Sequence, residues 1–120
     1  MTFIKAVVLS ILIGGLSFVA SSTARAGEVK MTIVNIETGQ GVKIWTPESI
    51  TAKRGDTVTL TLVNKLDAEH GYEIDGMKVK EVVGPQKTTT VTFKADKVGI
   101  FPIKCQLHPP HVAGQLVVLP

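Results

Sequence analysis

The chain has 120 residues, of which 44% are hydrophobic and 19% are charged, and its formal net charge is +3. That length suits one compact domain with a modest core. Because the basic residues form no patch with interleaved aromatic residues, we expect no nucleic-acid partner.

The first 26 residues have the pattern of a secretory signal peptide. Lys5 is the basic start, an apolar run extends from Ala6 to Ala20, and Ala24-Arg25-Ala26 fits a cleavage site between small residues. The apolar run is short for a bilayer span, although an uncut membrane anchor is the alternative. We therefore expect a signal peptide over 1–26 and a mature domain over 27–120. That domain would be periplasmic or secreted and would have no membrane span.

The residues after this segment alternate between apolar and polar in short runs, with turns between them and no convincing helix. The clearest strand is Thr57–Val63, where three apolar side chains would face one side and the threonines the other. Pro102 indicates an edge position or a bulge, and Lys43–Thr46 is only a short apolar piece. About eight strands predict an all-β, Greek-key β-sandwich. We expect them at Val29–Ile36, Ser49–Ala52, Thr57–Val63, Tyr72–Ile74, Lys78–Val83, Thr88–Phe93, Ile100–Cys105 and Gly114–Leu119.

The three histidines and the only cysteine fall into two short clusters. The first surrounds His70, and the second is Cys105-Gln106-Leu107-His108-Pro109-Pro110-His111. One thiolate and three imidazoles form a ligand set that suits copper and zinc. Three of these donors lie within seven residues, whereas His70 would have to be brought to them by the fold. The pattern predicts a mononuclear metal site on the sandwich.

Cys105 cannot form an internal disulfide, because the chain has no second cysteine. Unprotected thiols in oxidising compartments tend to oxidise or to pair between chains. Metal ligation would explain a lone cysteine beside two histidines, and a buried inert thiol is the alternative.

Several segments resemble the cupredoxins, small copper proteins with a β-sandwich fold. Within that family the likeness is greatest to nitrosocyanin, the red copper protein, and it runs from about Lys53 to Leu119. The most specific segment is Cys105-Gln106-Leu107-His108-Pro109, since Cys-x-x-His after a strand is the ligand loop of the family. The other matching segments are Lys53-Arg54-Gly55-Asp56, Gly71-Tyr72-Glu73-Ile74-Asp75, Glu81-Val82-Val83 and Thr92-Phe93-Lys94-Ala95-Asp96-Lys97.

The resemblance implies one copper ion per chain, with Cys105 as the thiolate ligand and His70, His108 and His111 as imidazole ligands. Nitrosocyanin has Glu at the position of His70, and most blue cupredoxins have Met at the position of His111. The loop from His108 to His111 is also shorter than the family usually shows. A bound imidazole from His111 would draw Cu(II) toward a tetragonal site with a red colour and a low potential.

We expect the chain to transfer single electrons to a redox partner that the sequence does not name, and we favour an electron carrier over an enzyme without deciding between them. A small copper enzyme with an exchangeable ligand position, a copper carrier and a structural zinc module are the alternatives. Nitrosocyanin-like relatives also leave open a homo-oligomer.

Overall fold

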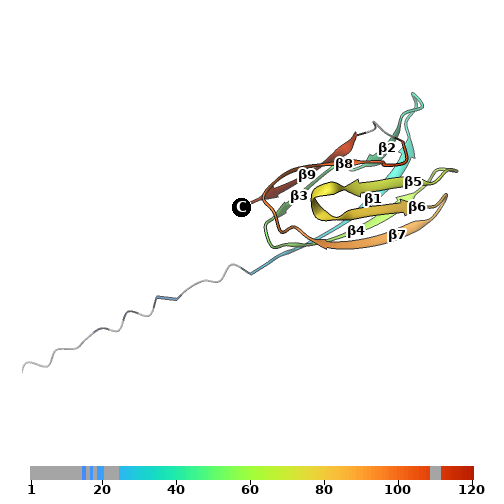
Figure 1. Cartoon of the computed structure of the whole chain (residues 1–120). Helices are drawn as coiled ribbons and strands as arrows, with labels where there is room; N and C mark the ends of the chain where they lie inside the picture. The colour runs from blue at the N-terminus through green and yellow to red at the C-terminus, as the bar shows by residue number, and fades with distance from the viewer. Residues whose placement is uncertain (1–14, 16, 18, 21–24, 109–111) are drawn as a thin grey trace, which may run out of the picture.

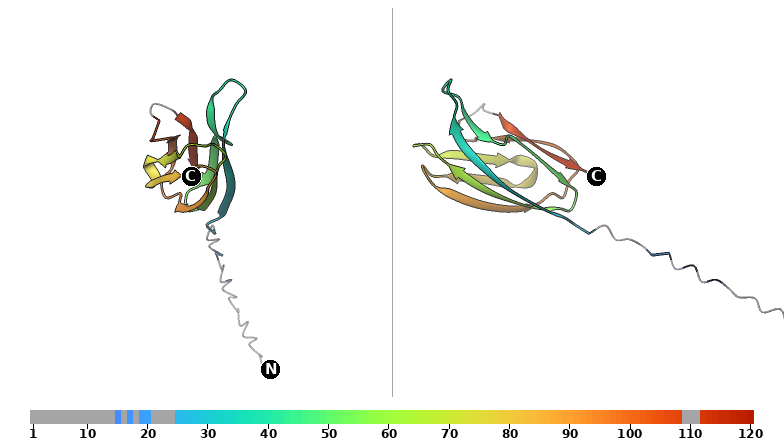
Figure 2. Two further views of the ribbon diagram at one scale, coloured as in Figure 1. Left: turned by 90° about the vertical axis from the view of Figure 1, so that its right-hand side faces the viewer. Right: turned by 180° about the vertical axis from the view of Figure 1, so that it is seen from behind.

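Two β-sheets pack face to face in the computed structural model, which describes residues 15, 17, 19–20, 25–108 and 112–120. The four-stranded sheet has the order β2-β1-β4-β7, and the five-stranded sheet has the order β3-β9-β8-β5-β6. Figure 2 shows the two layers from other directions. The predicted all-β sandwich is therefore confirmed.

The strands are short, as expected, and one single-turn 3-10 helix, η1, joins two of them. The pairs β1/β4 and β3/β9 are parallel, and the other pairs are antiparallel. The order of the strands in the two sheets shows that the chain passes repeatedly from one layer to the other. The elements are β1 Glu28–Glu37, β2 Lys43–Thr46, β3 Ser49–Lys53, β4 Thr57–Asn64, β5 His70–Ile74, η1 Asp75–Met77, β6 Val79–Val83, β7 Thr88–Lys94, β8 Gly99–Lys104 and β9 Val112–Leu119.

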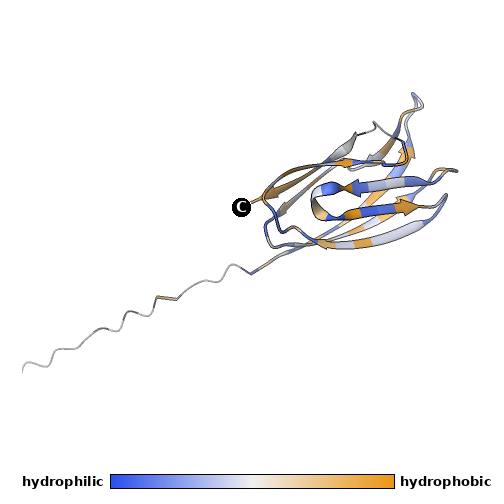
Figure 3. Cartoon of the chain, viewed as in Figure 1, coloured by the Kyte–Doolittle hydropathy of each residue, from blue (hydrophilic) through white to orange (hydrophobic). Residues whose placement is uncertain are grey.

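Alternation along the strands builds the core between the sheets (Figure 3). Val58, Leu60 and Leu62 of β4 are fully buried, while the threonines between them are only partly buried. Opposite them lie buried apolar residues of the five-stranded sheet, among them Ile74 and Ile103. Burial of these side chains is the main favourable contribution to folding, at roughly 25 cal/mol per Å² of apolar surface.

Two details differ from the sequence-based expectation. The short apolar piece Lys43–Thr46 forms a ninth strand, because it pairs with the end of β1. Pro102 lies in β8, which is an inner strand, yet β5 pairs with β8 only at Lys104 and Ile103. Pro102 therefore faces no β5 partner, and the expected bulge follows at Ile103/Lys104.

The predicted signal segment lies largely outside the described residues, so its cleavage after Ala26 stays a prediction. Within the part of the chain that the structure describes, no helix has the length and apolar character needed to cross a membrane.

Asn64 is the last residue of β4, and its side chain is buried. Its Nδ2 group donates to the carbonyl oxygens of Ala68 at 2.7 Å, Val83 at 3.1 Å and Gly84 at 3.1 Å. Its Oδ1 atom accepts from the backbone N–H of Leu66 at 3.0 Å. This one amide therefore shapes the loop that leads into His70 and ties it to the end of β6.

Replacing Asn64 with Ala should destabilise the fold by about 2–3 kcal/mol, because buried carbonyl groups would lose their donor. Urea unfolding of the metal-free domain measures this change. Lys65→Ala is the matched control, because the Lys65 side chain is exposed and should change stability by no more than about 0.5 kcal/mol. Equal stability of the two variants would contradict the role of Asn64.

Candidate metal centre

Three of the four predicted ligands come together at one end of the sandwich. His70 is the first residue of β5, and Cys105 and His108 follow β8 directly. One donor atom from each of these residues lies within 4.8 Å of the other two. His70 and Cys105 are buried, whereas His108 is exposed. The five-stranded sheet thus brings His70 beside Cys105, although the two residues are 35 positions apart in the sequence. A single metal site requires this proximity.

The Cys105 sulfur has two polar neighbours. The backbone N–H of Gly71 donates to Sγ at 3.2 Å, and Nδ1 of His108 lies 3.2 Å from the same atom. The backbone N–H of His108 also donates to the carbonyl of Cys105 at 3.2 Å, which closes a tight turn between these two residues. A donor aimed at sulfur stabilises the thiolate, which is the form that binds metals.

The imidazole of His70 is held in its neutral form. Burial lowers its pKa, and the nearby His108 and then Lys43 lower it further. Its ring centroid lies 5.0 Å from that of His108. Its Nε2 atom is buried and has no hydrogen-bond partner among the described residues. A neutral imidazole has a free lone pair, so His70 is ready to act as a ligand at neutral pH.

Gly71 links the two sides of this cluster. Its N–H group contacts the Cys105 sulfur, and its carbonyl accepts a hydrogen bond of 3.0 Å from the indole Nε1 of Trp45. Trp45 is buried and packs edge-on against Tyr72, with ring centroids 5.5 Å apart. Burial raises the pKa of the Tyr72 hydroxyl, so this phenol stays protonated. The hydrogen bond from Trp45 to Gly71 and the packing of Trp45 on Tyr72 therefore fix the segment of β5 that begins with His70.

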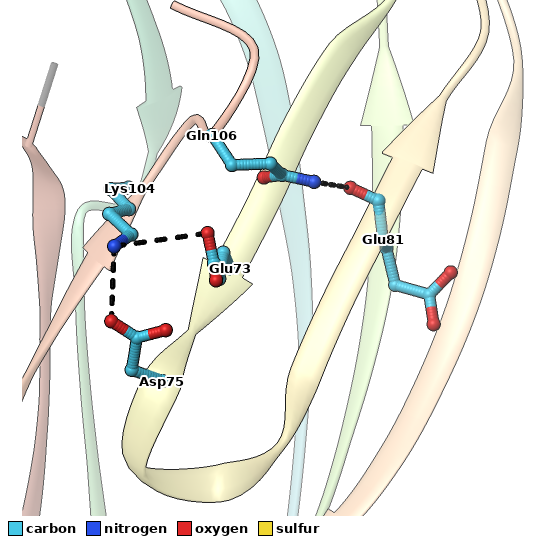
Figure 4. Close-up of polar contacts among 5 residues, drawn as sticks. All are labelled: Glu73, Asp75, Glu81, Lys104 and Gln106. Atoms are coloured by element: carbon cyan, nitrogen blue, oxygen red, sulfur yellow. Dashed lines mark hydrogen bonds and ion pairs between the residues drawn. The ribbon is translucent and has the colours of Figure 1, made fainter. Parts of the chain in front are cut away.

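Gln106 holds the ligand loop against the sheet, and sequence reasoning did not detect it. Its side chain reaches across β5, where Nε2 donates to the carbonyl of Glu81 in β6 at 2.9 Å (Figure 4). The amide end lies so close to Gly71 that a Cβ atom there would collide with it. The only hint in the sequence was the glycine beside His70, because a missing side chain leaves room for a close approach.

The neighbouring acidic residues do not join the cluster. Glu69 is exposed, as expected from its one-residue offset from His70. Glu73 and Asp75 instead face Lys104, whose Nζ lies 3.9 Å and 3.0 Å from their carboxylates (Figure 4). Met77 is buried at η1, beyond the far end of β5 from His70. Neither the carboxylates nor this thioether are placed to ligate a metal with Cys105.

The fourth predicted ligand, His111, lies outside the described residues together with Pro109 and Pro110. Its role as a ligand therefore stays a prediction.

The residues present fit a copper ion. One sulfur and two imidazole donors converge, and these are soft and borderline ligands that favour copper and also suit zinc. Among the described residues nothing bonds the buried Nε2 atom of His70, which leaves this nitrogen available to a metal ion.

Comparison with known proteins agrees with this fold. The family model described as "Cupredoxin-like domain" matches residues 9–118. The nitrous-oxide reductase of Cupriavidus necator is 48% identical over 56 residues, which are 44% of this chain and 9% of the reductase. That of Stutzerimonas stutzeri is 34% identical over 80 residues, which are 61% of this chain and 12% of the reductase. The chain thus spans about a tenth of the length of these relatives.

Among solved structures, the copper nitrite reductase from Nitrosomonas europaea has a similar fold. The TM-score is 0.65 at 22% sequence identity, and the match covers 78% of this chain and 42% of that chain. At this level of identity the likeness shows the fold alone. The likeness to nitrosocyanin is finer than the family match and stays a prediction.

Gly71→Ala should destabilise the metal-free domain by about 1–3 kcal/mol, because the new methyl group would collide with the Gln106 amide. Adding Gln106→Ala should recover much of that loss, since it removes the colliding group. A double-mutant cycle by urea unfolding measures this coupling.

Gly39→Ala is the control, because nothing lies within 4 Å of the position that its Cβ would take. This variant should stay within about 0.5 kcal/mol of the parent. Additive effects of the Gly71 and Gln106 substitutions would disprove the contact between them.

Proposed function

Because the chain belongs to the cupredoxin-like domain family, we propose that it is an exported electron carrier with one copper ion per chain. The proposed ligands are His70, Cys105, His108 and His111. The observation that carries this proposal is the convergence of donor atoms from His70, Cys105 and His108 within 4.8 Å. When bound, copper would accept one electron from a redox partner as Cu(II) and release it as Cu(I).

Copper fits this donor set better than a structural zinc ion does. Structural zinc sites stabilise small domains that lack a sufficient core. Here the sandwich has a continuous core of buried apolar residues from both sheets, so a metal staple is not needed. The thiolate and imidazoles would also supply the trigonal ligand set that is typical of copper electron-transfer sites.

The frame around the donors favours electron transfer over catalysis. His70 and Cys105 are buried, and the N–H group of Gly71, the residue after His70, donates a hydrogen bond to the Cys105 sulfur. Such a fixed ligand set needs little rearrangement between oxidation states. His108 is exposed, so its imidazole would provide the route by which an electron reaches the buried sulfur and metal.

The finer assignment is a red site of the nitrosocyanin type, in which His111 supplies a strong fourth ligand. Imidazole nitrogen favours Cu(II) more than a thioether does, so this ligand would lower the potential. The support is the sequence itself, which has His rather than Met in the loop after His108.

Export is supported by the signal-peptide pattern over 1–26. The same reasoning places the mature domain over 27–120 in the periplasm or outside the cell. Its partner would be a redox protein, and assembly into a homo-oligomer belongs to the nitrosocyanin-like assignment.

The mature domain loaded with Cu(II) should show a strong near-violet absorption band, and His111→Ala should convert it to an intense orange-red absorption with a blue colour. The physical reason is that removal of a strong fourth imidazole would leave the Cys105 thiolate as the dominant donor, which would strengthen the sulfur-to-copper absorption typical of blue sites. Visible absorption and electron paramagnetic resonance measure the change. Cys105→Ser is the control, and it should abolish the sulfur-to-copper bands.

An orange-red band that His111→Ala leaves unchanged would contradict ligation by His111. The absence of any sulfur-to-copper band would contradict the copper thiolate and would favour zinc or a Cu(I) carrier. A spectrum that changes on addition of azide would reveal an exchangeable position and would favour the copper enzyme.

A further inference from the structure

The end of the sandwich away from the metal ligands contains a buried carboxylate without a cationic side chain beside it. Asp56 precedes β4 and is 8% exposed. The ion pairs among the described residues involve other carboxylates. Burial of a carboxylate is costly unless hydrogen bonds or an opposite charge offset the lost hydration. The hydrogen-bond donors that face Asp56 must therefore offset this cost.

Two backbone N–H groups point at this carboxylate. That of Lys53 donates to Oδ2 at 2.9 Å, and that of Gly27 donates to Oδ1 at 2.9 Å. Lys53 lies in the same tight turn as Asp56, whereas Gly27 comes from 29 residues earlier in the chain. The contact with Gly27 is thus a tertiary contact that the fold creates.

Gly27 is fixed in place by its neighbours. Its carbonyl accepts a hydrogen bond of 3.0 Å from the N–H group of Thr57, and Glu28 opens β1 in register with Thr57. A Cβ atom on residue 27 would lie 2.9 Å from Oδ1 of Asp56. Only glycine therefore brings its nitrogen to the carboxylate without displacing it.

The nitrogen that contacts Asp56 is the one that the predicted cleavage would expose. Hydrolysis of the Ala26–Gly27 bond by water gives Ala26 a carboxylate and leaves Gly27 with an amine, which takes up a proton. We propose that Asp56 is the binding group for this α-ammonium of the mature chain, and that signal removal thereby converts a hydrogen bond from a neutral amide to the carboxylate into an ion pair.

Exposure and position agree with this proposal. Arg25, Ala26 and Gly27 are all exposed, so the bond between Ala26 and Gly27 is open to a peptidase. β1 begins at the end of the sandwich opposite to the start of β5, where His70 lies (Figure 1). Processing would therefore stabilise the fold without contacting the metal ligands, and the inference does not depend on the bound metal.

Three metal-free forms of the domain test the proposal by urea unfolding at pH 7. The first starts at Gly27, the second retains Ala26, and the third starts at an N-acetylated Gly27. The form with a free ammonium on Gly27 should have an unfolding equilibrium constant about tenfold lower than the other two, because an ammonium binds the carboxylate more strongly than a neutral amide N–H does. Intact mass of the exported full chain should also show a start at Gly27.

The advantage of the first form over the second should vanish with Asp56→Asn and persist with Asp96→Asn. Asp96 is an exposed acid that follows Ala95, whose backbone is hydrogen-bonded to Gly55 and Asp56. Equal stability of the acetylated and free forms would overturn the proposal even if Asp56→Asn fails to fold. A start other than Gly27, or an advantage that survives Asp56→Asn, would overturn it as well.

Discussion

The hydrogen bond from the Gly71 N–H group to the Cys105 sulfur is the contact on which the rest of the site depends. It spans 3.2 Å and joins residues 34 positions apart in the sequence. Because Gly71 adjoins His70, this contact holds the imidazole ligand and the sulfur ligand in one geometry. The opposite side of the same residue is fixed by the indole of Trp45. A donor to sulfur also reduces the charge that a thiolate presents to a metal, which tunes its potential.

The surrounding residues explain why this contact can persist. Trp45 and Tyr72 pack on the core side of Gly71, and Gln106 covers its outer side and is bonded to β6. Asn64 fixes the loop before His70 from within the core. The ligand end of the sandwich is therefore built from side-chain contacts to backbone groups, and few of them involve charge. Such contacts are insensitive to salt, unlike the exposed ion pairs of Lys104.

The sequence was sufficient for those features that depend on local patterns. Alternation over Thr57–Val63 predicted the buried face of β4, and the lone cysteine beside histidines predicted the donor set. It was not sufficient for Asn64, Gln106 and Trp45. Their partners lie between 2 and 29 residues away and are mostly backbone carbonyl groups, which leave no trace in residue type. The ninth strand was also missed, because four residues are too few to show a period.

The four predicted metal ligands also fall into two groups. All four ligands were named from the sequence, and His70, Cys105 and His108 lie together in the structure, whereas His111 lies outside the described residues. The contribution of the fold is to bring β5 beside the end of β8, which spacing along the chain could not reveal. The family match over residues 9–118 and the donor cluster are separate observations, and both agree with a copper-binding, cupredoxin-like domain.

X-ray absorption at the copper edge, on the mature domain loaded with copper and then dialysed, can identify the atoms that bind the metal. We expect one tightly held copper ion per chain, with one sulfur scatterer and the multiple-scattering pattern of imidazole rings. Copper surrounded only by nitrogen and oxygen, or copper lost on dialysis, would contradict the proposed centre of His70, Cys105 and His108.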